Sequence, residues 1–110
     1  MMTADKNYQG WTNYETWCIA LWIGNEQGSH NYWLEQAEEI FRRSKADNVL
    51  TQSERARFDL ADQLKSEIED GAPELNGMYA DLLTAAISEA NWSEIANSFF
   101  KDVEGYEQPK

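Results

Sequence analysis

Three short motifs typical of helix N-termini each stand directly before an apolar stretch. They are Thr12-Asn13-Tyr14-Glu15, Thr51-Gln52-Ser53-Glu54 and Asn91-Trp92-Ser93-Glu94. In each motif the first side chain can accept a hydrogen bond from the backbone N–H three residues on, and the glutamate can return it. The apolar residues that follow recur every three or four positions, the period of one helix face. A chain with several such starts is constrained to an all-α fold.

The spacing places five helices along the chain, with short polar breaks between them. They are expected at about residues 13–23, 29–45, 51–70, 73–89 and 91–103, with Ser29 as the cap of the second. Gly24-Asn25 and Gly71-Ala72-Pro73 are sequences that end helices, and proline also suits the first turn of the next one. A strand through residues 18–23 is the alternative for the first segment. We therefore expect an all-α, compact bundle of four to five short helices.

Apolar residues recur at helical spacing in each predicted helix. In the second helix the expected buried stripe is Trp33, Ala37, Ile40, Phe41 and Ser44, and in the third the apolar residues are Ala56, Leu60, Ala61, Leu64 and Ile68. The fourth carries Leu75, Met78, Tyr79, Leu82, Leu83, Ala86 and Ile87, and the fifth buries Trp92, Ile95, Ala96, Phe99 and Phe100. Faces of this kind supply the core of a helical bundle.

Four of the five tryptophans lie within the first 33 residues. Trp17 and Trp92 fall on helical stripes, so we expect them in the core. Trp11 precedes a predicted cap, where it can act as a hydrophobic staple. Trp22 stands between two other apolar residues, and three neighbours cannot share one helix face. Trp11 and Trp22 are therefore the candidate apolar anchors for a partner or a second subunit.

Length and charge limit the class of protein. The chain has 110 residues, which fits one helical domain over 1–110, with flexible ends at 1–10 and 105–110. Its net charge is −11, which argues against direct binding of nucleic acid or of an anionic membrane. The single cysteine and the polar N-terminus lead us to expect a cytoplasmic protein. The same charge permits a basic partner protein.

Residues for catalysis or for cofactor binding are scarce. The only histidine is His30 and the only cysteine is Cys18, which sits in a predicted apolar face where thiols are usually inert. One histidine and one cysteine do not make a structural zinc site, and no glycine-rich phosphate loop occurs. We therefore expect a binding protein rather than an enzyme, with no catalytic residue, cofactor or metal.

Acidic residues are densest in two places. The first is the junction of the third and fourth helices, with Glu67, Glu69, Asp70 and Glu74, and the second is the C-terminal part, with Glu89, Asp102 and Glu104. Several of them stand at helix C-termini, where the helix dipole disfavours negative charge. Rows of carboxylates can imitate DNA phosphates, although the same clusters also suit a solvated surface.

The N-terminal motif carries a family resemblance. Asn13-Tyr14-Glu15-Thr16-Trp17, followed by Ala20-Leu21-Trp22-Ile23, resembles short acidic proteins of bacteriophages, plasmids and integrated elements. Tyr32-Trp33, Ala72-Pro73-Glu74-Leu75 and Asn91-Trp92-Ser93-Glu94-Ile95-Ala96 extend the resemblance over nearly the whole chain. That family is uncharacterised, so the resemblance implies a genomic setting and no mechanism.

Charge, tryptophans and resemblance together favour one function. The expected protein inhibits a basic, nucleic-acid-binding defence protein of the host by occupying its cleft as a DNA mimic. Its carboxylates would carry the binding, with Trp11 and Trp22 as apolar anchors. The alternative is a structural or accessory protein that self-associates, as a homodimer, through its tryptophan-rich first helix.

Overall fold

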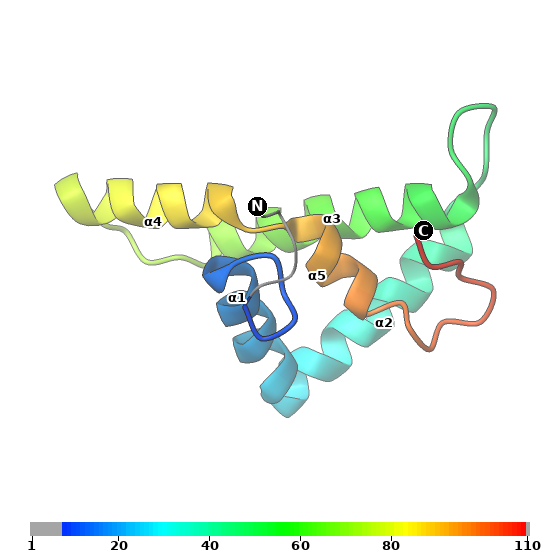
Figure 1. Cartoon of the computed structure of the whole chain (residues 1–110), viewed down its shortest axis with the longest axis horizontal. Helices are drawn as coiled ribbons and strands as arrows, with labels where there is room; N and C mark the ends of the chain where they lie inside the picture. Colours follow the sequence, from blue (N-terminus) through cyan, green and yellow to red (C-terminus); the bar gives the residue numbers. More distant parts are fainter. Residues whose placement is uncertain (1–7, 110) are drawn as a thin grey trace.

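The computed structural model describes residues 8–109 and contains five helices in this range (Figure 1). The predicted all-α class is confirmed, and the only β-type pairing among these residues is an isolated bridge between Tyr8 and Trp11. The expectation of a flexible N-terminus falls mostly on residues 1–7, outside the described part. The helices are α1 (Tyr14–Asn25), α2 (Gln27–Arg43), α3 (Gln52–Asp70), α4 (Gly77–Glu89) and α5 (Trp92–Ser98).

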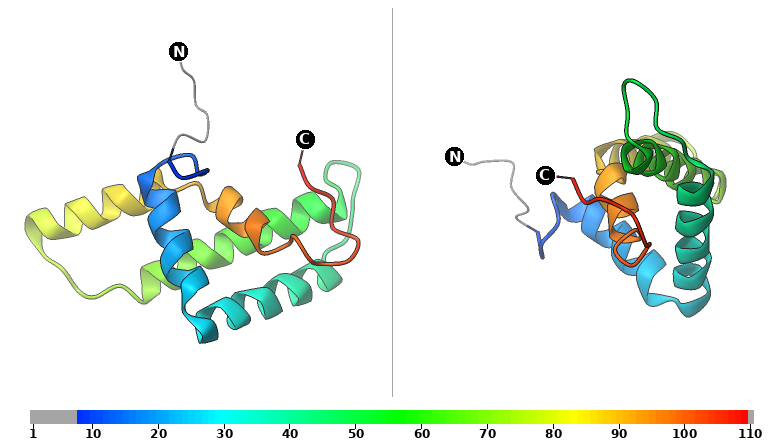
Figure 2. Two further views of the ribbon diagram at one scale, coloured as in Figure 1. Left: turned by 60° about the horizontal axis from the view of Figure 1, so that its bottom comes forward. Right: turned by 90° about the vertical axis from the view of Figure 1, so that its right-hand side faces the viewer.

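Helix α3 is the longest element, and α2 and α5 pack against it (Figures 1 and 2). The capping box predicted at its start is confirmed. The Thr51 hydroxyl accepts from the Glu54 N–H at 3.1 Å, and the Glu54 carboxylate accepts from the Thr51 N–H at 2.9 Å. Apolar faces of these three helices form the core, whose members are Trp33, Ala37, Ile40, Ala56, Leu60, Ala61, Leu64, Ile95, Ala96, Phe99 and Phe100.

The N-terminus of α1 is tied to the junction of α4 and α5. Asn13, and not the predicted Thr12, caps α1: its side chain accepts from the Thr16 N–H at 2.9 Å and donates to the Glu89 carbonyl at 2.8 Å. The fully buried Thr16 hydroxyl donates to Asn13 at 2.5 Å and accepts from the Asn91 N–H at 2.8 Å. Two of the three predicted cap motifs therefore meet in space. We call Asn13, Thr16, Glu89 and Asn91 the α1–α4 clasp.

Helix α2 begins earlier than predicted. Its cap is Glu26, whose carboxylate accepts from the Ser29 N–H at 2.7 Å, so the predicted Ser29 cap is wrong. Glu26 is the single residue between α1 and α2, so the same residue follows the end of α1 and caps the start of α2. The side chain of Glu26 reaches the free N–H groups of the first turn, as a serine would.

Helix α4 differs most from expectation. It begins at Gly77 rather than near Pro73, and residues 71–76 form a connecting segment. Figures 1 and 2 show its N-terminal end projecting beyond the end of α3. Of its apolar residues only Ile87 is buried, whereas Met78, Tyr79 and Leu82 are exposed. The helix contacts α1, and none of its residues belongs to the core cluster.

Helix α5 ends at Ser98, five residues before its predicted end. The chain continues in tight turns, with the N–H groups of Phe99 and Phe100 donating to carbonyls three residues back. Both rings are buried. Beyond the turns, the Tyr106 ring stacks on Phe100 with centroids 4.4 Å apart, and its hydroxyl donates to Asn97 at 2.6 Å. This stacking holds the C-terminal segment on the core.

The tryptophans occupy four kinds of environment. Trp33 is buried, and Trp11 and Trp92 are half-buried and pack against the core. The core placement predicted for Trp17 is wrong, because its ring lies in a surface cluster 5.1 Å from Tyr8. Trp22 is 73% exposed.

Candidate partner-binding surface

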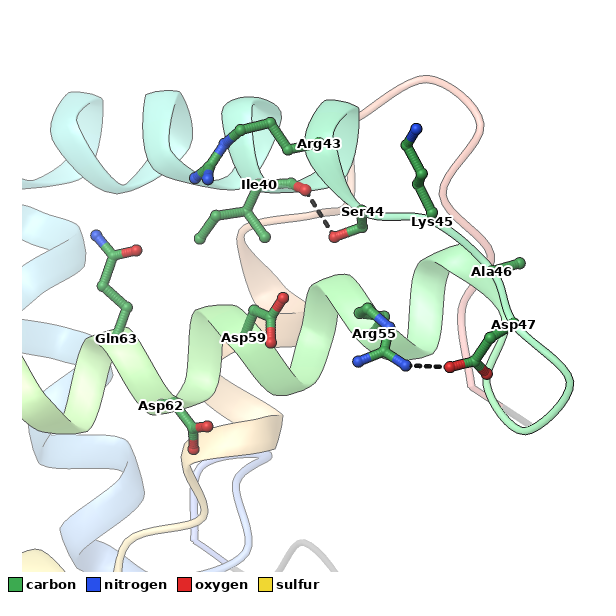
Figure 3. Close-up of a pocket in the computed structure, with 10 residues that line it drawn as sticks. All are labelled: Ile40, Arg43, Ser44, Lys45, Ala46, Asp47, Arg55, Asp59, Asp62 and Gln63. Carbon is green, nitrogen blue, oxygen red and sulfur yellow. Dashed lines mark hydrogen bonds and ion pairs between the residues drawn. The ribbon is translucent and has the colours of Figure 1, made fainter.

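One pocket is a charged space between α2 and α3 (Figure 3). Its volume is about 660 Å³. Its positive side chains already have partners, since Arg43 pairs with Glu39 and Arg55 pairs with Asp47. Lys45 points away from the space in Figure 3. The pocket therefore offers no concentration of one charge to a ligand.

Asp47 orders the turn at the end of this pocket. Its carboxylate accepts from the N–H groups of Leu50 and Val49, each at 2.8 Å, and these bonds together with Arg55 lower the pKa of Asp47 below 3.8. A lowered carboxyl pKa stabilises the fold above the unfolded-state pKa, and that contribution is lost as the pH falls through the folded-state value.

We expect carboxyl NMR titration to give Asp47 a pKa below 3.8. The backbone bonds from Leu50 and Val49 lower the pKa more than Arg55 does, so Arg55→Gln is expected to leave it lowered. A return to the ordinary aspartate value in that variant would show that the ion pair dominates instead.

A second pocket is almost wholly apolar. It lies between α1, the end of α3, the connecting segment and α4, with a volume of about 360 Å³. That volume is within the range of small-molecule and side-chain sites. Glu15 is its only charged lining residue. We call it the α1–α4 pocket, and it is lined by Tyr14, Glu15, Cys18, Ile19, Ile68, Ala72, Pro73, Leu83, Ala86 and Ile87.

On α1, the pocket wall continues onto the surface. Cys18 and Trp22 are four residues apart, so they share the helix face that lines the pocket. Tyr14 precedes Cys18 on the same stripe and is exposed. A hydrogen bond with Cys18 raises the pKa of Tyr14 above 10.0, so the phenol is neutral and its ring presents an apolar face. The exposed indole of Trp22 extends this stripe by one turn.

On α4, the opposite wall also extends outward. Tyr79 stands one turn before Leu83, which lines the pocket, and it is 65% exposed. Met78 and Leu82 adjoin it and are 64% and 60% exposed. Single apolar side chains on a surface are ordinary, but a contiguous group beside an apolar pocket is typical of an interaction site.

Three of the predicted carboxylates are close in sequence to pocket-lining residues. Glu69 and Asp70 end α3, and Glu74 stands in the connecting segment directly after Ala72 and Pro73, two lining residues. All three are exposed. We call Glu69, Asp70 and Glu74 the acidic rim.

The other predicted carboxylates lie elsewhere. Glu67 accepts from the Tyr32 hydroxyl at 2.9 Å, within a contact between α2 and α3. The backbone carbonyl of Glu89 accepts a hydrogen bond from the Asn13 side chain in the clasp. Asp102 and Glu104 belong to the segment that packs at the start of α3, where the Glu107 N–H donates to Ser53. The 19 residues of α3, about 28 Å at the helical rise, separate that end from the acidic rim.

The two predicted apolar anchors, Trp11 and Trp22, also lie in different places. Trp22 shares the pocket-lining face of α1, whereas Trp11 is half-buried against the core. The exposed residues Met78, Tyr79 and Leu82 were predicted as part of an apolar helix face and not as site residues. One signal could have found them: apolar residues cover more of the circumference of α4 than a single core-facing stripe needs.

Two kinds of feature are absent from residues 8–109. No group of three or more histidine, cysteine or acidic residues in this part is arranged to hold a metal ion. No helix there has the length and apolar character needed to cross a membrane.

The chain matches one known protein family. A family model described as a family of unknown function, DUF7249, matches residues 4–102, which include all five helices. No curated protein and no solved structure matches the chain. Because the family match covers most of the sequence, this protein belongs to the family of unknown function DUF7249.

Proposed function

We propose that this protein is a binding protein, not an enzyme, and that it docks a partner protein on the surface formed by α1 and α4. The observation that supports this most is the apolar pocket, together with exposed apolar side chains farther along the two helices that line it: Trp22 on α1, and Tyr79 and Leu82 on α4. Large aromatic and aliphatic side chains of this kind carry most of the energy of protein interfaces. Burying them on a partner removes apolar surface that the folded chain leaves in water.

The acidic rim points to a basic partner. Carboxylates around an apolar centre attract a partner with positive charge around its own apolar contact, and they raise the association rate. Nucleic-acid-binding proteins present such basic surfaces. We therefore propose inhibition of a basic nucleic-acid-binding protein. The resemblance to phage and plasmid proteins adds a setting, in which the target is a host defence protein of the cytoplasm and the rim takes the place of DNA phosphates.

Reversing the acidic rim is expected to weaken this association. The immobilised protein is first exposed to host lysate at low and moderate salt, and a retained DNA- or RNA-handling protein is purified. The Glu69→Lys, Asp70→Lys and Glu74→Lys triple variant should then bind that protein at least about tenfold more weakly.

The matched control reverses charge at the far end of α3. Asp102→Lys, Glu104→Lys and Glu107→Lys together change the net charge by the same amount as the rim variant but lie away from the pocket, so binding should change far less. Equal loss in both variants would mean that only net charge matters. Unchanged affinity in the rim variant would refute the electrostatic part of the proposal.

Self-association is the second candidate function. The tryptophan-rich helix α1 carries the exposed side chain of Trp22, and an exposed apolar side chain of this size can pair with its own copy across a two-fold axis. Light scattering after size-exclusion chromatography separates the two functions. A salt-insensitive dimer that Trp22→Ala dissociates would favour self-association, and a monomer would favour the hetero-partner.

A further inference from the structure

We infer that the partner segment is a basic amphipathic helix, and that one of its large apolar side chains fills the α1–α4 pocket. This inference rests on the proposed function and adds the chemistry of what is bound. It follows from the shape of the surface, the character of the pocket and the distribution of charge along the chain.

The shape of the surface suits a helix. The clasp joins the start of α1 to the end of α4 through the bond from Asn13 to the Glu89 carbonyl, and the two helices diverge from that point (Figure 2). Their apolar stripes each extend about 12 Å, as from Tyr14 to Trp22 at the helical rise. A partner helix with apolar residues at i, i+3 or i+4, and i+7 presents a stripe of similar length.

The pocket suits one large apolar side chain. Its walls come from α1 and α4, and Ile68, Ala72 and Pro73 close it on the side of α3 and the connecting segment. At about 360 Å³ it can take a leucine or an aromatic ring together with part of the adjoining turn. Glu15 is the only charge at its wall, placed where it can meet a lysine or arginine beside the inserted residue.

The distribution of basic residues argues against a second copy at this site. All lysines and arginines lie outside residues 7–41 and 66–100, so α1, α4 and the connecting segment contain only acidic charge. Two copies docked through this surface would bring two acidic rims together, and like charges at an interface are unfavourable. A basic helix provides the complementary charge.

The test uses a labelled synthetic helix with leucines at i, i+3, i+4 and i+7 and lysines at its other positions. A peptide of the same composition in scrambled order is the matched probe. Fluorescence anisotropy at moderate salt is expected to show saturable binding of the patterned peptide, at least about tenfold tighter than the scrambled one.

Two protein variants locate the binding. Ala86→Trp fills the pocket and should weaken patterned-peptide binding at least about tenfold, whereas Thr84→Trp, at an exposed position of α4 on the side away from Met78 and Leu82, should change it less than about twofold. Circular dichroism checks that both variants fold. Trp22→Ala, a change at an exposed position, is a second test and should weaken binding several-fold.

Equal binding of the two peptides, or full binding by a folded Ala86→Trp variant, would overturn the inference. Its failure is distinct from failure of the proposed function. If the peptide does not bind but a purified partner still depends on the acidic rim, the proposed function stands and the helical partner is wrong. If neither the partner nor the peptide depends on Glu69, Asp70 and Glu74, the proposed function itself fails.

Discussion

Phe100→Ala is expected to lower the free energy of unfolding by about 4 kcal/mol, within the usual range for a buried phenylalanine. The ring is fully buried where the turns after α5 meet the core of α2 and α3. It also stacks on Tyr106, which holds the C-terminal segment in place. The substitution therefore leaves a cavity and removes the surface on which that segment packs. Since small domains have a total stability of about 5 to 15 kcal/mol, the loss would be a large fraction.

The matched control is Phe58→Ala. Phe58 lies on α3, and its side chain is 47% exposed, so the same chemical change should cost less than about 1 kcal/mol. Urea unfolding followed by far-UV circular dichroism measures both variants, and equal slopes would show that the unfolding transition is comparable. Similar losses in the two variants would contradict the assignment of Phe100 to the core.

The core could be predicted from sequence because its pattern is local. The stripe of α3 with Leu60 and Leu64 follows a capping box and repeats at helical spacing, so both the helix and its buried face were predictable. The stripe of α2 with Trp33 and Ala37 follows the same logic. In these helices the predicted face and the buried face agree, since each has a neighbouring helix that covers it.

At α4 the same spacing of apolar residues does not correspond to a buried face. A row of apolar residues at helical spacing predicts a helix face that is buried against another surface. It does not show whether that surface belongs to the same chain or to a partner. Met78, Tyr79 and Leu82 follow this spacing as well as the residues of α3 do, yet the fold places no helix over them. The candidate site is therefore the place where a local pattern and the tertiary arrangement disagree, which is common at functional surfaces.

The choice of helix cap also depends on tertiary contacts. Thr12 and Asn13 are both good N-cap residues, so sequence alone cannot decide between them. In the structure the Thr12 N–H donates to the Glu94 carboxylate at 3.1 Å, and the Asn13 side chain bridges to Glu89. These long-range bonds place Asn13 at the cap position. The acidic rim is a similar case, because Pro73, the residue before Glu74, lines the pocket only through the path of the connecting segment.

Thr16→Val is expected to lower the free energy of unfolding by about 2 kcal/mol. Valine has the shape of threonine, so the packing of this fully buried side chain is kept while both hydrogen bonds of its hydroxyl are lost. The Asn91 N–H then loses its partner in a partly buried site, while Asn13 Oδ1 keeps the bond from the Thr16 N–H. An unsatisfied donor of this kind costs about 1 to 3 kcal/mol. Thermal or urea unfolding measures the change.

Thr84→Val is the matched control, because Thr84 is exposed on α4 and should change stability by no more than about 0.5 kcal/mol. The comparison also separates two roles of the Asn13–Trp17 motif. If its asparagine and threonine serve the clasp, Thr16→Val lowers stability but leaves peptide binding intact at temperatures where the variant is folded. Loss of binding without loss of stability would mean instead that Thr16 itself contributes to the partner contact, and its role in the clasp would then be secondary.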